Sequence, residues 1–412
     1  MITETGPTYA TYSEPALPTI TNAGDIITDA TFGCRILKLT DSTDSATGCT
    51  VPYSNHLLFN SDNTRVMCNY YDGWYKVKHW VFNPSTLAIS SGTVMPQSVA
   101  GIQQTGTQFS HLDTDKMWVS CAGGTPGSEI SKIYSYKPST QAFTLVKDLT
   151  ATVVANGGAG CYLFQLSVSA DDDIFAGHVT GPSGGVGYIV YKKSTDTILL
   201  NQSGVTVNEV YIDKSGRYLW VVGGTPDATV WDLQGGPSST TVTTEISAGQ
   251  HYALGSGWDL MHSMSSGRIG KRDLASPNGG VTALVDVNKW VYGGAGSQQD
   301  HYSALGPDTW VLGSRYNTVG GTVVNPFDNE LVLVKTDGTG NVRRLGHHRA
   351  VFTSYYDAPF AALSQDSAFA MFSSNWGNSG RYDAYIIETG VSDPPAAPPP
   401  TNVGTVSFMR FI

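Results

Sequence analysis

Short apolar runs of strand length, separated by tight polar turns, recur along the chain, and residues 208–233 show this pattern most clearly. The segment reads NEVYIDKSGRYLWVVGGTPDATVWDL. Val210 and Ile212 alternate with Tyr211 and Asp213, residues 214–216 carry a turn signal, and residues 218–222 form a continuous apolar run. Period-two alternation bounded by Gly, Pro, Asp and Ser is typical of antiparallel strands. The pattern therefore predicts successive hairpins and an all-β fold.

The same unit repeats at spacings of 42 to 59 residues along the 412-residue chain. The spacing is measured between the apolar residues that precede the first turn of each unit, which are Phe59, Phe109, Val168, Ile212, Leu254, Ala304 and Leu363. Four strands per unit at such a period is the sequence signature of a β-propeller, and seven anchors predict seven blades. A stack of sandwich domains is the alternative, and it requires linkers that are not visible before residue 391.

One unit is incomplete and one strand stands alone, and we expect the two to complete each other. The seventh unit ends after the apolar run at residues 382–388, whereas residues 33–41 (GCRILKLTD) predict an isolated strand near the N-terminus. Pairing the two closes the ring and removes its last open edge. The predicted organisation is an N-terminal arm over residues 1–30, a seven-bladed propeller over 31–390, and a Pro-rich tail over 391–412 that ends in a short strand.

Composition narrows the classes of function. A net charge of −10 argues against nucleic acid, whose recognition needs clustered Lys and Arg. No apolar run approaches the roughly 20 residues needed to span a bilayer, and residues 1–18 lack the features of a secretory signal. We expect no nucleic-acid partner and no membrane insertion, a location outside the cell or on a virion surface, and self-assembly or a protein partner that holds the arm and the tail. The five cysteines lack CxxC spacing and are expected to be mostly buried thiols.

Polar residues are expected to converge where the inner strands begin. Positions three residues before the anchors should face the central channel, and they are His56, Gly106, Gln165, Glu209, His251, His301 and Phe360. Histidine and carboxylate suit a divalent cation, so His56, His251 and His301 are candidate metal ligands. Alternatively, His251 or His301 acts as a catalytic base while Arg315 or Arg343 neutralises a uronate carboxylate. A third interpretation is a wet channel whose polar side chains are bridged by water.

Aromatic residues at the ends of the predicted blades are candidate ligand-binding residues. Tyr71 and Trp74 belong to the aromatic-dense stretch YYDGWY, and Tyr355, Tyr356 and Trp376 occupy similar positions near the last blade. Flat aromatic faces can stack on sugar rings. With Gln165 and Glu209, these residues form the predicted carbohydrate-contacting set. The alternative is that the aromatic rings pack between blades.

Several segments of the chain resemble a known propeller group. The elements FNSDNTRVMC (59–68), VSADDDIFAG (168–177), IDKSGRYLWV (212–221) and LSQDSAFAMF (363–372) resemble the FSPDG hairpins of TolB-like propellers. The segments TFGCRILKLTD and SSNWGNSGRYDAYIIE resemble the oligogalacturonate-lyase branch of that superfamily. The resemblance covers roughly residues 31–390. It implies a divalent metal at the top of the propeller, held by histidines and a glutamine. Part of that set comes from a His-x-His before the last inner strand, whereas residues 355–359 here contain no histidine.

Two functions from different classes follow. The first is a non-catalytic binding or structural module of an extracellular or virion-like assembly that contacts glycans. The second is a polysaccharide lyase-like enzyme that acts on uronates with a divalent cation at the propeller mouth. A third hypothesis is a protein scaffold in which residues 401–412 add a strand to a neighbouring chain.

Overall fold

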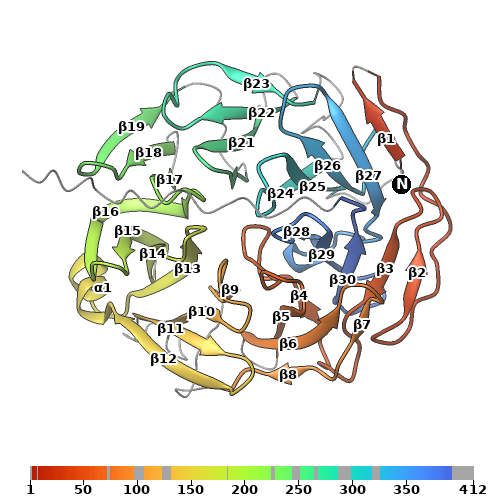
Figure 1. Ribbon diagram of the computed structural model, residues 1–412, viewed down its shortest axis with the longest axis horizontal. Helices are drawn as coiled ribbons and strands as arrows, with labels where there is room; N and C mark the ends of the chain where they lie inside the picture. The colour runs from red at the N-terminus through yellow and green to blue at the C-terminus, as the bar shows by residue number, and fades with distance from the viewer. Residues whose placement is uncertain are drawn as a thin grey trace, which may run out of the picture.

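The computed structural model describes residues 2–6, 8–71, 75–96, 106–122, 131–182, 184–223, 228–243, 251–263, 268–285, 298–317 and 325–391. Strands dominate these residues, and their sheets surround a common centre (Figure 1). The all-β propeller fold that the sequence predicts is therefore confirmed. The described helices are α1 (Thr150–Gly157), which the sequence analysis did not anticipate, and one turn of 3-10 helix, η1 (Tyr355–Asp357).

The described strands form six hydrogen-bonded sheets. The first contains β4 (Cys49–Thr50), β5 (Arg65–Tyr71), β6 (Tyr75–Asn83), β7 (Ala88–Ile89) and β8 (Thr93–Val94), and the second contains β9 (Gln108–Phe109), β10 (Met117–Ala122), β11 (Ser131–Lys137) and β12 (Ala142–Asp148). The third contains β13 (Tyr162–Val168), β14 (Ile174–Gly181), β15 (Gly184–Lys192), β16 (Thr197–Ile212), β17 (Tyr218–Gly223), β18 (Ala228–Asp232) and β19 (Ser238–Val242). The fourth contains β20 (Ala253–Leu254), β21 (Trp258–Ser263), β22 (Arg268–Asp273) and β23 (Val281–Ala283). The fifth contains β24 (Gln298–Ser303), β25 (Trp310–Asn317), β26 (Glu330–Lys335), β27 (Asn341–His347) and β1 (Ile2–Thr5). The last contains β28 (Ala362–Leu363), β29 (Phe369–Ser374), β30 (Asp383–Glu388), β3 (Arg35–Lys38) and β2 (Ile26–Thr28).

The long strand β16 is the reason why the described strands do not divide into seven separate sheets. The sequence pattern predicts one strand over residues 196–200 and a second that begins near residue 208. In the structure these are one strand, which pairs with β15 along its first part and with β17 from Val207 onward. Register shifts on both sides of Val207 bend β16, and Gly204 takes a φ of 71° beside the bend. A bend therefore replaces the expected break, and the expected count of seven separate blades is not confirmed.

The closing strand lies where the sequence predicts it. β3 pairs antiparallel with β30, with Ile36 opposite Ile387 and Lys38 opposite Tyr385. Leu37 is fully buried in this sheet, and β2 adds a further strand outside β3. In Figure 1 the red and orange N-terminal strands accordingly lie beside the blue C-terminal ones. Ring closure between the two ends of the propeller is confirmed.

The N-terminal segment is held by its own chain. β1 pairs with β27, and Glu4 accepts a hydrogen bond of 2.9 Å from Nη1 of Arg344. Arg344 is fully buried and also forms a bidentate pair with Glu330. A buried guanidinium is tolerated only when its donors are paired, so Glu4 anchors this segment to the ring. Of the tail at residues 391–412, the structure describes only Val391, which is buried.

Turns at the far ends of the inner strands link successive sheets. Asp172 accepts hydrogen bonds from Ser110 and from the indole N–H of Trp118 in the preceding sheet. The run of three aspartates at 171–173 is thus a hairpin turn that joins two sheets. Other hydrogen bonds between turns of different sheets join Asn60 to Thr114, Ser256 to Asp308, and Asn63 to Asp366, and one between two turns of the third sheet joins Ala170 to Lys214. These contacts fix one end of the channel, and the candidate site lies at the other end.

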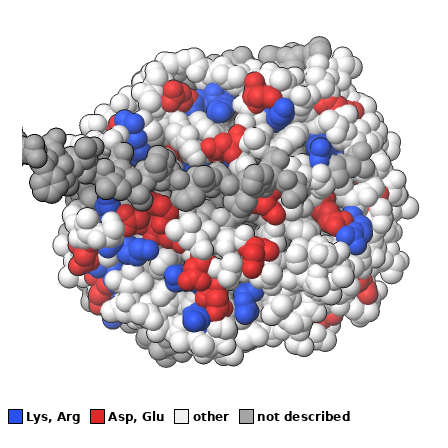
Figure 2. Space-filling model, in the orientation of Figure 1, with Lys and Arg blue, Asp and Glu red and all other residues white. Residues whose placement is uncertain are grey.

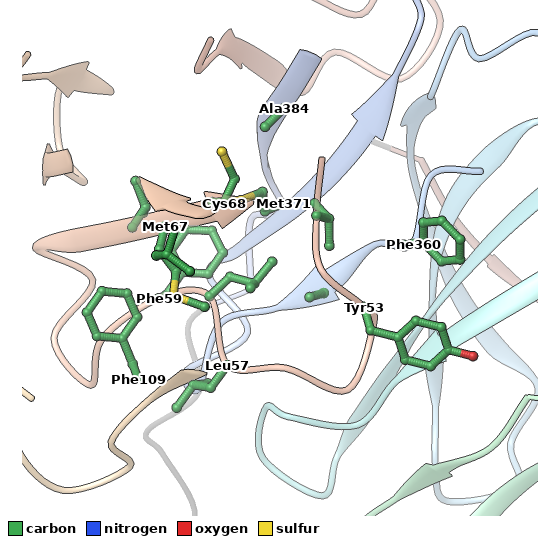
Figure 3. Close-up of a cluster of buried hydrophobic side chains, with 14 of the residues drawn as sticks. Tyr53, Leu57, Phe59, Met67, Cys68, Phe109, Phe360, Met371 and Ala384 are labelled. Atoms are coloured by element: carbon green, nitrogen blue, oxygen red, sulfur yellow. The ribbon is translucent and has the colours of Figure 1, made fainter. Parts of the chain in front are cut away.

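Apolar side chains fill the spaces between the sheets. Figure 3 shows one cluster, in which Leu57, Phe59 and Phe109 meet Met67. The described cysteine side chains, Cys34, Cys49, Cys68 and Cys161, are buried and free, as the sequence predicts.

On the coloured part of the face in Figure 2, Lys and Arg lie in small groups beside Asp and Glu. No helix among the described residues has the length and apolar character needed to cross a bilayer.

Candidate functional site

Five side chains meet where the inner strands begin. Tyr53 comes from the loop after β4, Glu209 from β16, His251 from just before β20, His301 from β24, and Phe360 from just before β28. Four of the five occupy the positions predicted to face the channel. Tyr53 is the residue that the sequence analysis missed, because it lies in a loop and not at an anchored position of an inner strand. In Figure 3 its ring lies beside Phe360, and its hydroxyl points away from the apolar cluster.

A hydrogen-bonded network joins Tyr53, Glu209 and His251. The Tyr53 hydroxyl donates to Oε1 of Glu209 at 2.6 Å and lies 2.7 Å from Nδ1 of His251. Since the hydroxyl has one proton, it accepts from Nδ1–H of His251 when it donates to Glu209. Burial raises the pKa of Glu209, but hydrogen bonds from His251 and Tyr53 outweigh it and leave that pKa below its usual value. Burial and the Glu209 charge raise the pKa of Tyr53 well above 10. The network therefore holds a buried carboxylate next to a protonated phenol.

His301 lies behind this network as a neutral ring. It is fully buried, and neither ring nitrogen has a hydrogen-bond partner. Its ring stacks on His251 with centroids 3.9 Å apart and lies 4.4 Å from Phe360. Burial holds the pKa of His301 well below 6.5, and the neighbouring His251 lowers it further. His301 therefore packs as an aromatic ring in the channel wall.

Arg315 lies away from the channel network. It projects from β25, is fully buried, and its Nε lies 3.3 Å from Oδ1 of Asp328. Its backbone carbonyl accepts a hydrogen bond of 2.8 Å from Nε2 of His348. Because its guanidinium is buried beside an aspartate and does not line the cavity described below, Arg315 is not placed to neutralise a ligand carboxylate there. The role predicted for Arg315 is therefore not supported by its position.

A cavity of about 310 Å³ opens beside the network. It falls at the low end of the range for small-molecule pockets, roughly 300–1,000 Å³. Three buried polar atoms in its wall lack a hydrogen-bond partner, namely Nδ1 of His56, Oδ1 of Asn69 and Oε1 of Gln165. The residues that line the cavity are Thr50, Val51, Pro52, Tyr53, His56, Asn69, Phe164, Gln165, Tyr355, Tyr356 and Phe360. The structure thus places His56 and Gln165, two of the predicted site residues, in one wall.

Two residues of the cavity have unusual backbone conformations. Gln165 has a φ of 50° and Phe360 a φ of 42°, in the left-handed region that non-glycine residues rarely adopt. Around Gln165 the pairing of β13 with β14 is interrupted between Phe164 and Ser167. This irregularity allows the adjacent Phe164 and Gln165 to line the same cavity, although neighbours in a regular strand point to opposite faces. Backbone strain of this kind often accompanies a functional site.

Tyr355 and Tyr356 form the exposed edge of the cavity. They are 56% and 45% exposed, and the Tyr355 ring lies 4.9 Å from Phe360. Both belong to η1, whose geometry depends on Asp357. That carboxylate accepts from the backbone N–H of Ser354 at 2.5 Å and from Nδ2 of Asn375 at 2.9 Å. The two tyrosines are therefore presented on a turn that is fixed from beneath.

The other predicted aromatic residues lie elsewhere. Trp376 is 8% exposed and stacks on Tyr385 with centroids 4.7 Å apart, while its indole N–H donates to the Pro18 carbonyl at 2.9 Å. It thus packs in the core and does not line the cavity, as the alternative interpretation of these aromatics anticipated. Tyr71 ends β5, but its side chain and the whole of Trp74 lie outside the described residues.

Solved structures with this fold include two lyases. An oligogalacturonate lyase in complex with manganese aligns with a TM-score of 0.62 at 13% identity, over 90% of this chain and 97% of that one. An oligogalacturonate lyase from Vibrio parahaemolyticus gives a TM-score of 0.59 at 10% identity, with the same coverage. The chain has the fold of these lyases. The resemblance that the hairpin motifs indicated is confirmed at the level of fold. No family model and no curated protein matches the sequence.

The described residues of this lyase-like fold do not fit a histidine-bound metal. Among them, no three His, Cys, Asp or Glu side chains are placed to hold an ion. His251 and His301 present ring faces to each other, at an interplanar angle of 26°, whereas metal binding uses the nitrogen lone pairs in the ring plane. The predicted ligand set of His56, His251 and His301 is therefore not assembled in the structure, although its members lie at the same end of the channel.

Proposed function

We propose that this protein is a non-catalytic β-propeller that binds a carbohydrate in the cavity edged by Tyr355 and Tyr356. The observation that carries the proposal is the combination, in one cavity, of two exposed aromatic rings and three unpaired buried polar atoms. Sugars present apolar C–H faces that stack on aromatic rings and hydroxyls that satisfy buried polar groups. Tyr71, Trp74 and Gln165 remain part of the proposed ligand-contacting set, and Glu209 contributes to it through Tyr53, whose hydroxyl donates a hydrogen bond to Glu209.

Glycan binding by the wild-type protein and by two variants tests this proposal. A glycan array followed by calorimetry should identify a ligand, and Tyr355→Ala and Tyr356→Ala should each weaken its binding by about tenfold, because each removes a stacking face. Leu145→Ala is the matched control, since Leu145 is 50% exposed on β12 and lies outside the cavity. Unchanged affinity in both tyrosine variants would remove the cavity from the proposal.

A uronate lyase-like enzyme is the second candidate. It is favoured by the Tyr53–Glu209–His251 network, in which a histidine and a phenol share hydrogen bonds, and by the fold of the two lyases. His251 would serve as the base and His301 as its neighbour; a divalent cation belongs to this candidate only by analogy. Incubation of the protein with uronate polymers, with and without Mn²⁺, tests it. Unsaturated product that disappears in His251→Gln would favour this candidate over the first.

We also propose that the ring has seven blades, with β13 to β15 and β17 to β19 forming two blades that share the bent strand β16. The pairing of β16 with β15 before Val207 and with β17 after it supports this count. An extracellular or virion-like assembly, held through residues 391–412 or the N-terminal arm, is the setting that we propose for the propeller. Deleting residues 391–412 should then reduce assembly in light scattering while the propeller stays folded.

A further inference from the structure

The polar atoms left unpaired in the cavity indicate which chemistry its ligand must supply. Oδ1 of Asn69 and Oε1 of Gln165 are amide oxygens, which accept hydrogen bonds and cannot donate them. Asn69 is 4% exposed and Gln165 is half-buried, and both amide oxygens are themselves buried without a hydrogen-bond partner. A buried acceptor without a donor costs free energy, which a ligand that donates would recover. Hydroxyl or amino groups at these two positions therefore match the wall.

The charges around the cavity select against an anionic ligand. Among the described residues that line it, none is Lys or Arg. His56 is also no cation at neutral pH, because burial lowers its pKa to about 4. The carboxylate of Glu209 lies immediately behind Tyr53, whose hydroxyl donates to it at 2.6 Å, so a negative charge lies close to the cavity wall. A carboxylate brought into this cavity would lie near the negative charge of Glu209 and would find no cationic side chain among the described lining residues.

We propose that the cavity binds a neutral or amino sugar and discriminates against uronates. This inference rests on the carbohydrate-binding function proposed above and gives it a ligand class. Stacking on Tyr355 and Tyr356 would hold one face of the sugar ring, while its hydroxyl or amino groups donate to Asn69 and Gln165. The selectivity separates this chain from the two lyases that share its fold, since their names specify a uronate substrate.

Matched oligosaccharides provide the test, because members of a pair differ only at C6. The probes are trisaccharides of galactose and galacturonate, of glucose and glucuronate, and of mannose and mannuronate, each pair with the same linkage, together with a glucosamine trisaccharide. Calorimetry at pH 7 and fixed ionic strength should give at least tenfold tighter binding for the neutral or amino member. Asn69→Leu should weaken binding of that member at least fivefold, because it removes the acceptor and keeps the size of the side chain.

A variant that adds a positive charge to the cavity wall tests the same preference in the opposite direction. Gln165→Arg places a cation in the wall and should narrow or reverse the preference between the two members of a pair. Circular dichroism and thermal unfolding of both variants confirm that the propeller is intact; if Asn69→Leu does not fold, Asn69→Ser replaces it.

The outcomes distinguish failure of the proposed ligand class from failure of the carbohydrate-binding function. A uronate that binds as tightly as its neutral partner, in a manner weakened by Tyr355→Ala, would overturn the ligand class and leave the carbohydrate-binding function standing. If no probe binds and the glycan array is also silent, both proposals fail. If a probe binds but its affinity is unchanged in Tyr355→Ala and Tyr356→Ala, the cavity is not the binding site, and the ligand class proposed for the cavity fails.

Discussion

At the residue scale, buried neutral histidines make the protein sensitive to acid. Burial lowers the pKa of His178 to about 4, and the same cause gives His56 and His79 pKa values of about 4. An unfolded histidine titrates near 6.5. Between these values the unfolded chain binds more protons than the folded one, so stability decreases as the pH falls from about 6.5 and levels off below about 4. Each such histidine lowers the free energy of unfolding by roughly 2 kcal/mol at pH 5.

His178→Phe tests this origin of acid sensitivity. His178 lies in β14 with both ring nitrogens unpaired and its ring 5.0 Å from that of Phe164, so phenylalanine can keep the aromatic contact. The variant should lose about 2 kcal/mol less than the wild type between pH 7 and pH 5, measured by denaturant unfolding at both pH values. The change in packing is common to the two pH values and cancels in the difference. An equal loss in both proteins would contradict the assignment.

The sequence predicts the direction of a side chain where position along a strand decides that direction. Glu209, His251 and His301 were placed in the channel because each lies three residues before an anchor. Tyr53 was missed because a loop residue has no such register. Trp376 was misplaced because the stacking partner that buries it, Tyr385, is defined by sheet packing and not by local pattern.

At the element scale, the closing strand β3 carries a large share of the packing of the last sheet. Leu37 is fully buried and lies opposite Ile26 of β2, which is 41% exposed. Leu37→Ala should lower the free energy of unfolding by about 3 kcal/mol, since it removes buried methyl groups and leaves a cavity. Ile26→Ala is the matched control on the paired strand and should change stability by less than about 0.5 kcal/mol. Denaturant unfolding measures the free energy of unfolding of both variants. Similar losses in the two would contradict the claim that Leu37 of β3 carries the packing of the last sheet.

Strand existence was more predictable than strand boundaries. Alternation identified the two ends of β16, but the polar, glycine-containing stretch between them was interpreted as a break. Its pairing with β15 continues through that stretch, so tertiary contacts override the local signal. The helix α1 contains the β-branched residues Thr152 and Val153 and begins without a side-chain cap. Its formation is favoured by packing of Val153 into the core, which local propensity does not reveal.

At the scale of the whole molecule, the ring was predictable because its signals are local and repeated. A few residues specify each hairpin turn, and the spacing between turns along the chain indicates how often the sheets repeat. The path of the N-terminal arm was not predictable, since the pairing of Glu4 with Arg344 joins residues 340 positions apart. The cavity was predictable in part. Its inner-strand residues follow the repeat, whereas Tyr53 comes from the loop after β4 and Asn69 from β5 of the same sheet.

Ring closure through the N-terminal strand can be tested on the intact fold. Removing residues 1–40 deletes both β1 and β3 and would leave β27 and β30 as open edges, whose unpaired N–H and C=O groups can pair with another chain. We expect the truncated protein to self-associate and to unfold at lower denaturant concentration. A peptide of residues 2–41, which contains β1, β2 and β3, should restore the monomer because it supplies the strands that cover both edges.

Light scattering with and without this peptide measures the effect. The same peptide carrying Leu37→Asp is the control that should not restore the monomer, since a charge would enter the apolar interior of the sheet beside β30. If the truncated chain stays monomeric and as stable as the full chain, the ring does not depend on β3. If both peptides rescue it equally, the edge is covered without the specific pairing of Ile36 and Leu37 with β30. Rescue by the wild-type peptide alone would show that the two ends of the chain are joined by the pairing seen here, which is how a ring of sheets avoids a free edge.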